Sequence, residues 1–362
     1  MSNFIEYKDS IAFHPGYYIK ELVDESGLTQ EDFAKRLDTS PKNLSLLIRG
    51  EQSLSVDMAI KLSRLIGTSI EYWLGLQNTY DSLIAEFELQ NEFEREKDIL
   101  NKIGYKYFKD NFNFPDLKRK IEQQVEYVRK YLNISTLSVL NKYDFTVSFR
   151  SSRANVRDKN IIKANTMVQI AINKALSVET PKFDKKKFDK AIDYALTFTN
   201  SHTEFYPYIY KAFHEAGVIF IILPNLEGSK INGATKKLGS KVVLMVNDRR
   251  LYADSFWFTL FHEIGHIVND DYGLSFEDDY GEKEKIADDY AANRLIPPDM
   301  YEKFIADNEY FDLNIICDFA KKIDRDPGII LGRLQNDGKV RYDDINLMQL
   351  KRKYRIKINQ TN

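Results

Sequence analysis

The chain has 362 residues and a formal net charge of −2, and its composition is 43% hydrophobic and 29% charged. This length exceeds what one simple core accommodates and predicts two or three domains. A near-neutral chain has no global field that recruits nucleic acid, and the single Cys317 excludes a disulfide framework and a thiolate zinc cluster. The opening MSNFIEYKDS does not resemble a signal peptide, and no apolar run approaches the ~20 residues that span a bilayer. We therefore expect a cytoplasmic protein.

Helical periodicity with clear starts and stops dominates residues 1–80. The expected helices run from Pro15 to Ser26, from a cap at Thr29, from Ser40 with Pro41, from Ser55, and from Ile70 to Leu76. The second and third lie in LTQEDFAKRLDTSPKNLSLLIRG and are separated by a short joint. Two short helices so joined fit a helix-turn-helix, whose later helix enters the major groove of DNA.

The outward side chains of that third helix offer hydroxyl, amide and cationic groups, which suit base edges and phosphates. They are Ser40, Lys42, Asn43, Ser45 and Arg49. Residues 1–80 nevertheless carry eight basic and eleven acidic side chains, a net charge of −3. A helical dimerisation or protein-docking module is therefore the alternative to DNA binding.

The same segment resembles the XRE-type helix-turn-helix of the HigA antitoxin family. The matching features are His14-Pro15-Gly16, Leu28-Thr29-Gln30, Ser40-Pro41 and Trp73-Leu74-Gly75-Leu76-Gln77. This resemblance implies binding of operator DNA as a homodimer, and hence transcriptional regulation. It also implies that Gln30 joins the third-helix residues as a DNA contact.

Residues 81–200 are expected to form a helical connector, with its apolar residues on one side and a solvated charged face on the other. The lysine run Lys185–Lys187 is expected in a loop. No G-x-x-x-x-G-K-[ST] motif occurs, so ATP-driven chemistry is not indicated.

The strongest chemical signal is the pentad His262-Glu263-Ile264-Gly265-His266. Positions i and i+4 of a helix share one face, so both imidazoles can bind one metal ion. Glu263 is rotated by about 100° from His262 and can reach a water held by that ion. The pattern predicts a zinc hydrolase site, and the alternative is a buried amphipathic helix with two incidental histidines.

Two buried strands, Val218–Leu223 and Lys241–Asn247, are expected before the pentad, with a turn at Asn232–Ala234 between them. The free edge of the second strand could pair with an extended peptide and lay its scissile bond over the metal. Besides the metal, an oxyanion needs a donor, for which His202, His214 and Tyr290 are open candidates.

A third metal ligand is expected from a helix between Glu282 and Leu295. Within it, Glu284 and Asp288 lie one turn apart on one face, as a ligand and a carboxylate that orients a histidine. Glu282 competes for the ligand role and Asp289 for the orienting role. An acidic, solvated helix face is the alternative.

Residues 217–298 resemble the ImmA/IrrE metallopeptidase family through two motifs. The first is FTL-x-HE-x-GH, and the second comprises Glu284, Ala287, Tyr290, Ala291, Ala292, Leu295 and Pro297. The resemblance implies a gluzincin-like endopeptidase with His262, His266 and Glu284 as Zn²⁺ ligands and Glu263 as general base. It also implies that the substrate is a regulatory protein.

We therefore expect a mainly α fold with a small β-sheet (α+β) in four parts. These are a five-helix helix-turn-helix domain (1–80), a helical connector (81–200), a zincin-like metallopeptidase core (201–305) and a helical segment packing on that core (306–362). The expected function is DNA-binding regulation joined to zinc-dependent cleavage of a repressor or antitoxin by metal-activated water. The alternative is a repressor or antitoxin whose zinc domain senses a signal or binds a protein without proteolysis. The expected partners are operator DNA, the protein substrate and a second copy, without a membrane.

Overall fold

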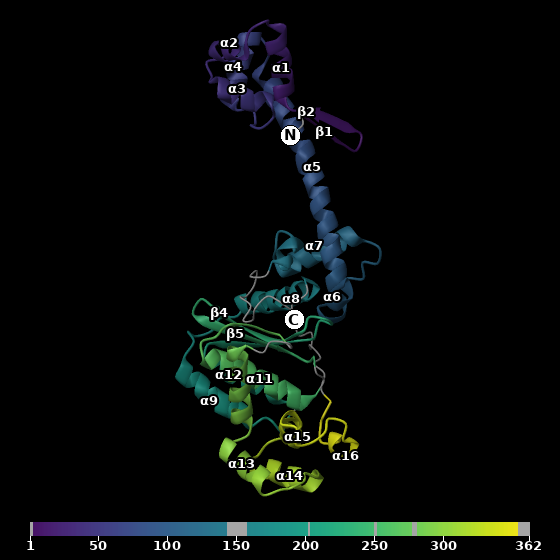
Figure 1. The fold of residues 1–362 in the computed structure, drawn as a ribbon, viewed down its shortest axis with the longest axis vertical. Helices are drawn as coiled ribbons and strands as arrows, with labels where there is room; N and C mark the ends of the chain where they lie inside the picture. The colour runs from purple at the N-terminus through teal and green to yellow at the C-terminus, as the bar shows by residue number, and fades with distance from the viewer. Residues whose placement is uncertain (1–2, 143–157, 202, 250–251, 277–280, 354–362) are drawn as a thin grey trace. The chain divides into compact units, whose positions relative to one another are not determined.

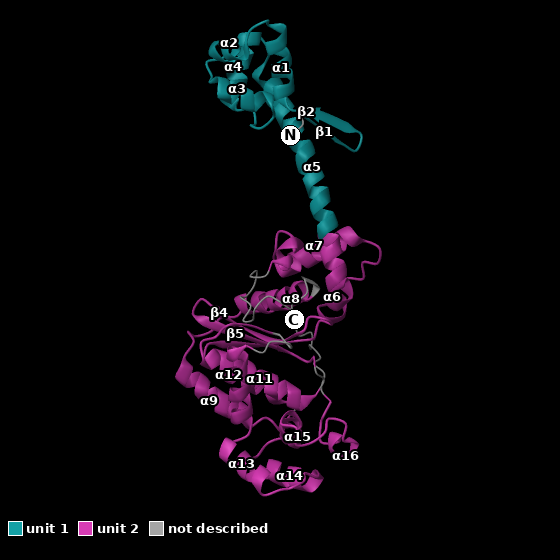
Figure 2. Ribbon diagram, in the orientation of Figure 1, with its two compact units in different colours: residues 1–95 teal, residues 96–362 magenta. Residues whose placement is uncertain are grey.

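The computed structural model describes residues 3–142, 158–201, 203–249, 252–276 and 281–353 (Figure 1). The chain divides into two compact units, residues 1–95 and 96–362, hereafter the N-terminal and C-terminal units (Figure 2). Each unit has its own apolar core. The finer division of the chain at residues 80, 200 and 305 stays a prediction.

The N-terminal unit consists of a β-hairpin followed by helices. Its elements are β1 (Phe4–Tyr7), β2 (Ser10–Phe13), α1 (Pro15–Glu25), α2 (Gln30–Arg36), α3 (Pro41–Ile48), α4 (Val56–Ile66) and most of α5 (Ile70–Ile103), whose last residues belong to the C-terminal unit. The hydroxyls of Thr29, Ser40 and Ser55 each accept a hydrogen bond from a backbone amide three residues on. These caps confirm the predicted starts of the second, third and fourth helices.

Two features of this unit differ from expectation. The hairpin β1–β2 was not expected, and its apolar side packs with Tyr80 and Leu83 of α5. The fifth helix does not end at Leu76 but continues to Ile103, a length of 34 residues. No glycine or proline occurs between Leu76 and Gly104, so nothing in the chain stops the helix earlier.

The first part of the C-terminal unit is helical. Its elements are α6 (Tyr105–Asn111), α7 (Ile121–Leu132), the 3₁₀ helix η1 (Leu137–Asn141), α8 (Asp158–Leu176), α9 (Lys185–Leu196) and α10 (Phe205–Glu215). The lysine run Lys185–Lys187 forms the first turn of α9 rather than a loop. Asp184 caps this turn by accepting a hydrogen bond from the Lys187 backbone amide. The expectation of a loop, which was based on the charge of the three lysines alone, was therefore wrong.

A four-stranded sheet follows, in the order β3 (Val218–Leu223), β5 (Lys241–Asn247), β4 (Ile231–Leu238), β6 (Gly273–Phe276). β5 runs parallel to β3 and antiparallel to β4, so the strand expected to offer a free edge is paired on both sides. Asn232–Ala234 lies within β4 rather than in a turn. The Asn-Gly pair resembles a turn locally, but Gly233 pairs with Val246 of β5 and with Ser275 of β6, and the register against β6 shifts between Ile231 and Gly233.

The remaining elements are α11 (Ala253–Val268), α12 (Glu282–Leu295), α13 (Pro298–Ala306), α14 (Leu313–Lys322), α15 (Pro327–Asn336) and α16 (Ile345–Met348). α11 contacts β4 and β5 of the sheet as well as α12 and α15 (Figure 1). Its Trp257, Phe261 and Ile264 are buried. A mainly helical chain with small sheets confirms the expected α+β class. Within the described ranges, no helix is long and apolar enough to cross a membrane.

Candidate functional site

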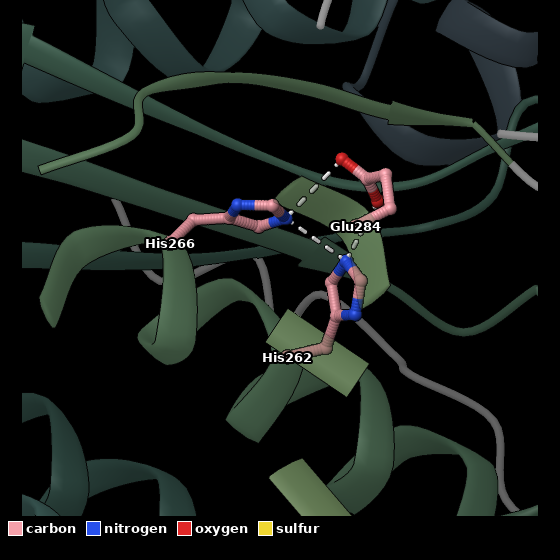
Figure 3. A group of neighbouring side chains, drawn as sticks. All are labelled: His262, His266 and Glu284. Atoms are coloured by element: carbon pink, nitrogen blue, oxygen red, sulfur yellow. Dashed lines mark hydrogen bonds and ion pairs between the residues drawn. The ribbon is translucent and has the colours of Figure 1, made fainter. Parts of the chain in front are cut away.

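The pentad lies in the C-terminal half of α11, where the helix is buried. His262 and His266 are one turn apart, and their Nε2 atoms approach to 3.1 Å. Glu284 reaches the same point from α12, with Oε2 at 3.0 Å from His262 Nε2 and Oε1 at 3.3 Å from His266 Nε2 (Figure 3). All three side chains are buried. The structure thus brings together three side chains from two helices.

The donor set and its spacing fit a zinc ion. Imidazole nitrogens and a carboxylate oxygen are ordinary zinc ligands, and an ion about 2.1 Å from each in tetrahedral geometry needs them roughly 3.4 Å apart. The three observed separations, 3.0, 3.1 and 3.3 Å, are close to this requirement. Because all three separations are slightly shorter than this, a small outward shift of the side chains would admit the ion. No other cluster of this kind occurs in the part of the chain that the structure describes.

The alternatives left open on α12 are separated by the geometry. Glu284, not Glu282, lies beside the histidines, since Glu282 is exposed at the first position of the helix. Asp288 Oδ1 lies 2.7 Å from His262 Nδ1, whereas Asp289 is exposed and joins only the wall of the adjoining cleft. That Glu284 binds the metal and Asp288 orients His262 stays a prediction about roles.

Carboxylates around the histidines favour a cation at this position. Burial opposes a positive charge on His262, but hydrogen bonds to Asp288 and Glu284 outweigh it and raise the pKa of His262 to about 10. Burial also opposes a negative charge on Glu284, but its contacts with both histidines outweigh it and lower the pKa of Glu284 to about 2. A metal ion binding here would release the proton of His262.

A second carboxylate, which the sequence did not single out, contacts the other histidine. Asp271 Oδ2 lies 3.2 Å from His266 Nδ1, and Asp271 Oδ1 accepts from Lys283 Nζ at 2.8 Å. Each histidine therefore has a carboxylate on the ring nitrogen that faces away from the cluster. Asp271 follows the pentad by five residues, a separation that carries no helical signal once α11 has ended.

Glu263 is fully buried and lies against the sheet rather than against solvent. The backbone of Gly233 in β4 approaches it so closely that a Cβ there would lie 2.6 Å from Glu263 Oε1. The absence of a side chain at Gly233 therefore makes room for this carboxylate. The negative charge of Glu263 also contributes to the raised pKa of His262, the residue before it in α11.

A cleft of ≈ 510 Å³ adjoins the cluster and includes His262 and Glu284 in its wall. Phe258, Leu295 and Ile329 supply apolar lining, while Asp289, Arg333 and Asp337 supply charged lining. The chain segment after α16 closes one side, where Lys351 Nζ pairs with buried Asp254 at 2.9 Å. The cleft beside the three clustered side chains is therefore large enough to hold side chains of a bound peptide.

Neither of the two oxyanion candidates that the structure describes, His214 and Tyr290, lines this cleft. His202 lies outside the described residues. His214 bonds the Glu179 carbonyl at 2.7 Å. Tyr290 instead packs against Gly265, where a Cβ would meet its ring at 3.1 Å.

The residues expected to contact DNA gather at α2 and α3 of the N-terminal unit. Gln30 is the first residue of α2; Ser40 caps α3, and Lys42 and Arg49 are exposed. Asn43 is half-buried and donates to Thr39 Oγ1 at 2.9 Å.

The last of these residues forms a local hydrogen-bond network. Arg49 donates to Ser45 Oγ and to both carboxylate oxygens of Glu51. All six predicted DNA contacts, Gln30, Ser40, Lys42, Asn43, Ser45 and Arg49, are partly or fully accessible in the described N-terminal unit, and their contact with DNA stays a prediction.

Both parts of the chain match known protein families. Residues 19–73 match the helix-turn-helix family, and residues 218–316 match the IrrE N-terminal-like domain of peptidase family M78. Over 72 residues, 20% of this chain, it is 40% identical to the HTH-type transcriptional regulator YddM of Escherichia coli and covers 77% of that protein. The chain belongs to the helix-turn-helix regulators. It joins this domain to an IrrE-like one, so both resemblances expected from the sequence are confirmed.

Other relatives share the helix-turn-helix part. Virulence-associated protein I of Dichelobacter nodosus is 32% identical over 81 residues, which are 22% of this chain and 75% of that protein. Among solved structures, a HigA-family addiction-module antidote protein from Coxiella burnetii is 28% identical, with a TM-score of 0.22, and the match covers 23% of this chain and 91% of that one. A Pseudomonas aeruginosa protein crystallised with its operator DNA is 29% identical, with a TM-score of 0.22 and coverage of 24% and 90%.

Proposed function

We propose that this helix-turn-helix regulator is also a zinc-dependent endopeptidase that cleaves a regulatory protein, a repressor or an antitoxin. The observation that carries the proposal is the convergence of His262, His266 and Glu284 at separations of 3.0–3.3 Å, with Glu263 buried next to them. A site that only held a metal for structural reasons needs ligands, but it needs no additional carboxylate.

The chemistry would be hydrolysis of an amide bond. Zinc bound to the three ligands would supply Lewis acidity and lower the pKa of a water. Glu263 would accept the proton from that water and return it to the leaving nitrogen. Asp288 would orient His262 through its Nδ1. The adjoining cleft would receive side chains next to the scissile bond.

An outer strand near the cluster supports the binding of an extended peptide. In the described part of the sheet, β6 pairs with β4 on one side only, so its other edge can accept a strand from the substrate. We therefore propose β6, which follows α11 in the sequence, as the pairing strand, since β5 before α11 has both edges occupied.

The N-terminal unit would bind operator DNA through α3, as a homodimer. Family membership and the accessible set Gln30, Ser40, Lys42, Asn43, Ser45 and Arg49 support this half of the proposal. DNA binding and proteolysis in one chain point to a substrate that acts at the same promoter, which is why we favour a regulatory protein.

Co-expression with the regulator encoded beside its gene tests the peptidase directly. We expect the wild-type chain to cleave that protein, as followed by intact mass. Glu263→Gln should bind zinc with the wild-type stoichiometry but cleave about 10²- to 10⁴-fold more slowly, because only the general base is lost.

The alternative function makes the opposite prediction in the same experiment. A chain whose zinc domain only senses a signal would bind operator DNA and zinc, yet neither it nor Glu263→Gln would cleave any regulator. That result would contradict the peptidase proposal and leave the DNA-binding half standing.

A further inference from the structure

The chain turns back directly after α11, and the turn returns a carboxylate to the second histidine. Asp270 has a φ of 53°, and the Asp271 amide donates to the His266 carbonyl at 2.8 Å. The Asp271 carboxylate then lies 3.2 Å from His266 Nδ1, with its side chain only 13% exposed. Backbone geometry therefore holds this carboxylate against the ring.

An acceptor at Nδ1 decides which ring nitrogen can bind a metal. A neutral imidazole carries hydrogen on one nitrogen only, so donation from Nδ1–H leaves the Nε2 lone pair available. Nε2 of His266 is the atom that faces His262 and Glu284. We propose that Asp271 is a positioning residue that holds the tautomer and the ring orientation of His266 for metal binding. This inference rests on the proposed zinc site.

The two histidines differ in how well their carboxylates are shielded from water. The side chain of Asp288, beside His262, is 55% exposed, whereas that of Asp271 is 13% exposed. A hydrogen bond is stronger electrostatically where the local dielectric is low. Asp271 should therefore contribute more to metal binding than the carboxylate that the sequence pointed to.

Asp271 could also affect metal binding in a second way, through its ion pair with Lys283, and the experiment must distinguish the two. Its Oδ1 pairs with Lys283, which immediately precedes the ligand Glu284, so Asp271 could act by clamping the start of α12. Lys283 is 64% exposed, and exposed ion pairs contribute little. His266, by contrast, is 1% exposed, so we assign the effect of Asp271 to its contact with the ring.

Zinc affinity of the full-length chain, measured by competition with a chromogenic chelator, tests the inference. We expect Asp271→Asn to bind zinc about 10- to 100-fold more weakly. Lys283→Gln should change affinity less than about fivefold, the limit for an exposed ion pair. Asp270→Asn is the matched control, since Asp270 bonds the Tyr272 hydroxyl instead of a histidine, and it should leave affinity unchanged.

Two outcomes would overturn the inference. Wild-type affinity in Asp271→Asn would show that the contact does not matter, and an equal loss in Lys283→Gln would assign the effect to the clamp. Circular dichroism of the metal-free chains checks folding, and Asp271→Ser carries the same expectation should the asparagine chain misfold. If the wild-type chain binds no zinc, the proposed function fails together with this inference; if only the Asp271 result fails, the zinc site stands.

Discussion

Glu284 is the residue on which the proposed metal site depends most, because it comes from a different helix from the two histidines. Its carboxylate contacts both rings, and these contacts lower its pKa to about 2 despite burial. Glu282, two residues earlier, carries the same functional group but is exposed. The pair therefore offers a matched comparison at the scale of one side chain.

We predict that Glu284→Gln loses stoichiometric zinc, since an amide is a weaker ligand than a carboxylate, whereas Glu282→Gln retains it. Metal analysis of the purified chains checks this expectation. Equal zinc content in the two variants would mean that a different group completes the site.

At the scale of elements, the site depends on how closely α11 approaches the sheet. Gly233 in β4 leaves the space that Glu263 occupies, and a Cβ at this position would lie within 2.6–2.7 Å of three atoms of that carboxylate side chain. Glu263 is fully buried, so it has little room to move aside.

Gly233→Ala should therefore displace Glu263 and slow cleavage by about 10²- to 10⁴-fold, as expected for a misplaced general base, while zinc binding persists. Peptidase assays and metal analysis on the same preparation separate the two effects. Gly75→Ala is a suitable control, because a Cβ there meets nothing within 4 Å. Normal activity in Gly233→Ala would argue against the proposed role of Glu263.

The helix α3 allows a second prediction at this scale. Lys42 is exposed on α3, whereas Lys61 lies on α4 and pairs with Asp57 at 3.1 Å. Lys42→Ala should weaken operator binding. It should also reduce the slope of the logarithm of the binding constant against the logarithm of the salt concentration by about one, because one phosphate contact is lost. Lys61→Ala should leave both unchanged. Fluorescence anisotropy over a range of salt concentrations measures operator binding by both variants. An equal loss of affinity in the two variants would contradict the proposal that α3 contacts the DNA.

At the scale of the whole molecule, the chain consists of two units with separate cores. The core of the N-terminal unit comes from residues 19–73, and the large core of the C-terminal unit comes from residues 188–347. The candidate metal ligands all lie in the C-terminal unit. Ligand binding stabilises the folded form by mass action, and because the two cores are separate we expect the effect in the unit that holds the ligand.

Zinc at 100 times its Kd should therefore stabilise the C-terminal unit by about 2.7 kcal/mol, and a chelator should reverse the effect. The N-terminal unit should unfold at the same temperature with and without zinc. Calorimetry, or hydrogen exchange resolved by segment, measures the two units separately. Equal zinc-dependent stabilisation of both would contradict their independence.

Features that depend on residues close together in the chain could be predicted from the amino-acid sequence. Thr29, Ser40 and Ser55 start helices because a hydroxyl bonds an amide three residues away. The spacing of His262 and His266 likewise predicted one helical face, since a helix repeats every 3.6 residues. The length of α12, from Glu282 to Leu295, followed from the same periodicity and from the prolines after it.

Features that depend on residues brought together by packing could not be predicted from local patterns. β5 is central and β6 is an outer strand because of pairings between distant segments, which no local pattern encodes. Gly233 is needed because Glu263, thirty residues later in the chain, packs against it. Asp271 reaches His266 through the left-handed backbone at Asp270, a conformation that side-chain periodicity does not predict. Local hydrogen bonds set the helices, and long-range packing set the surroundings of the site.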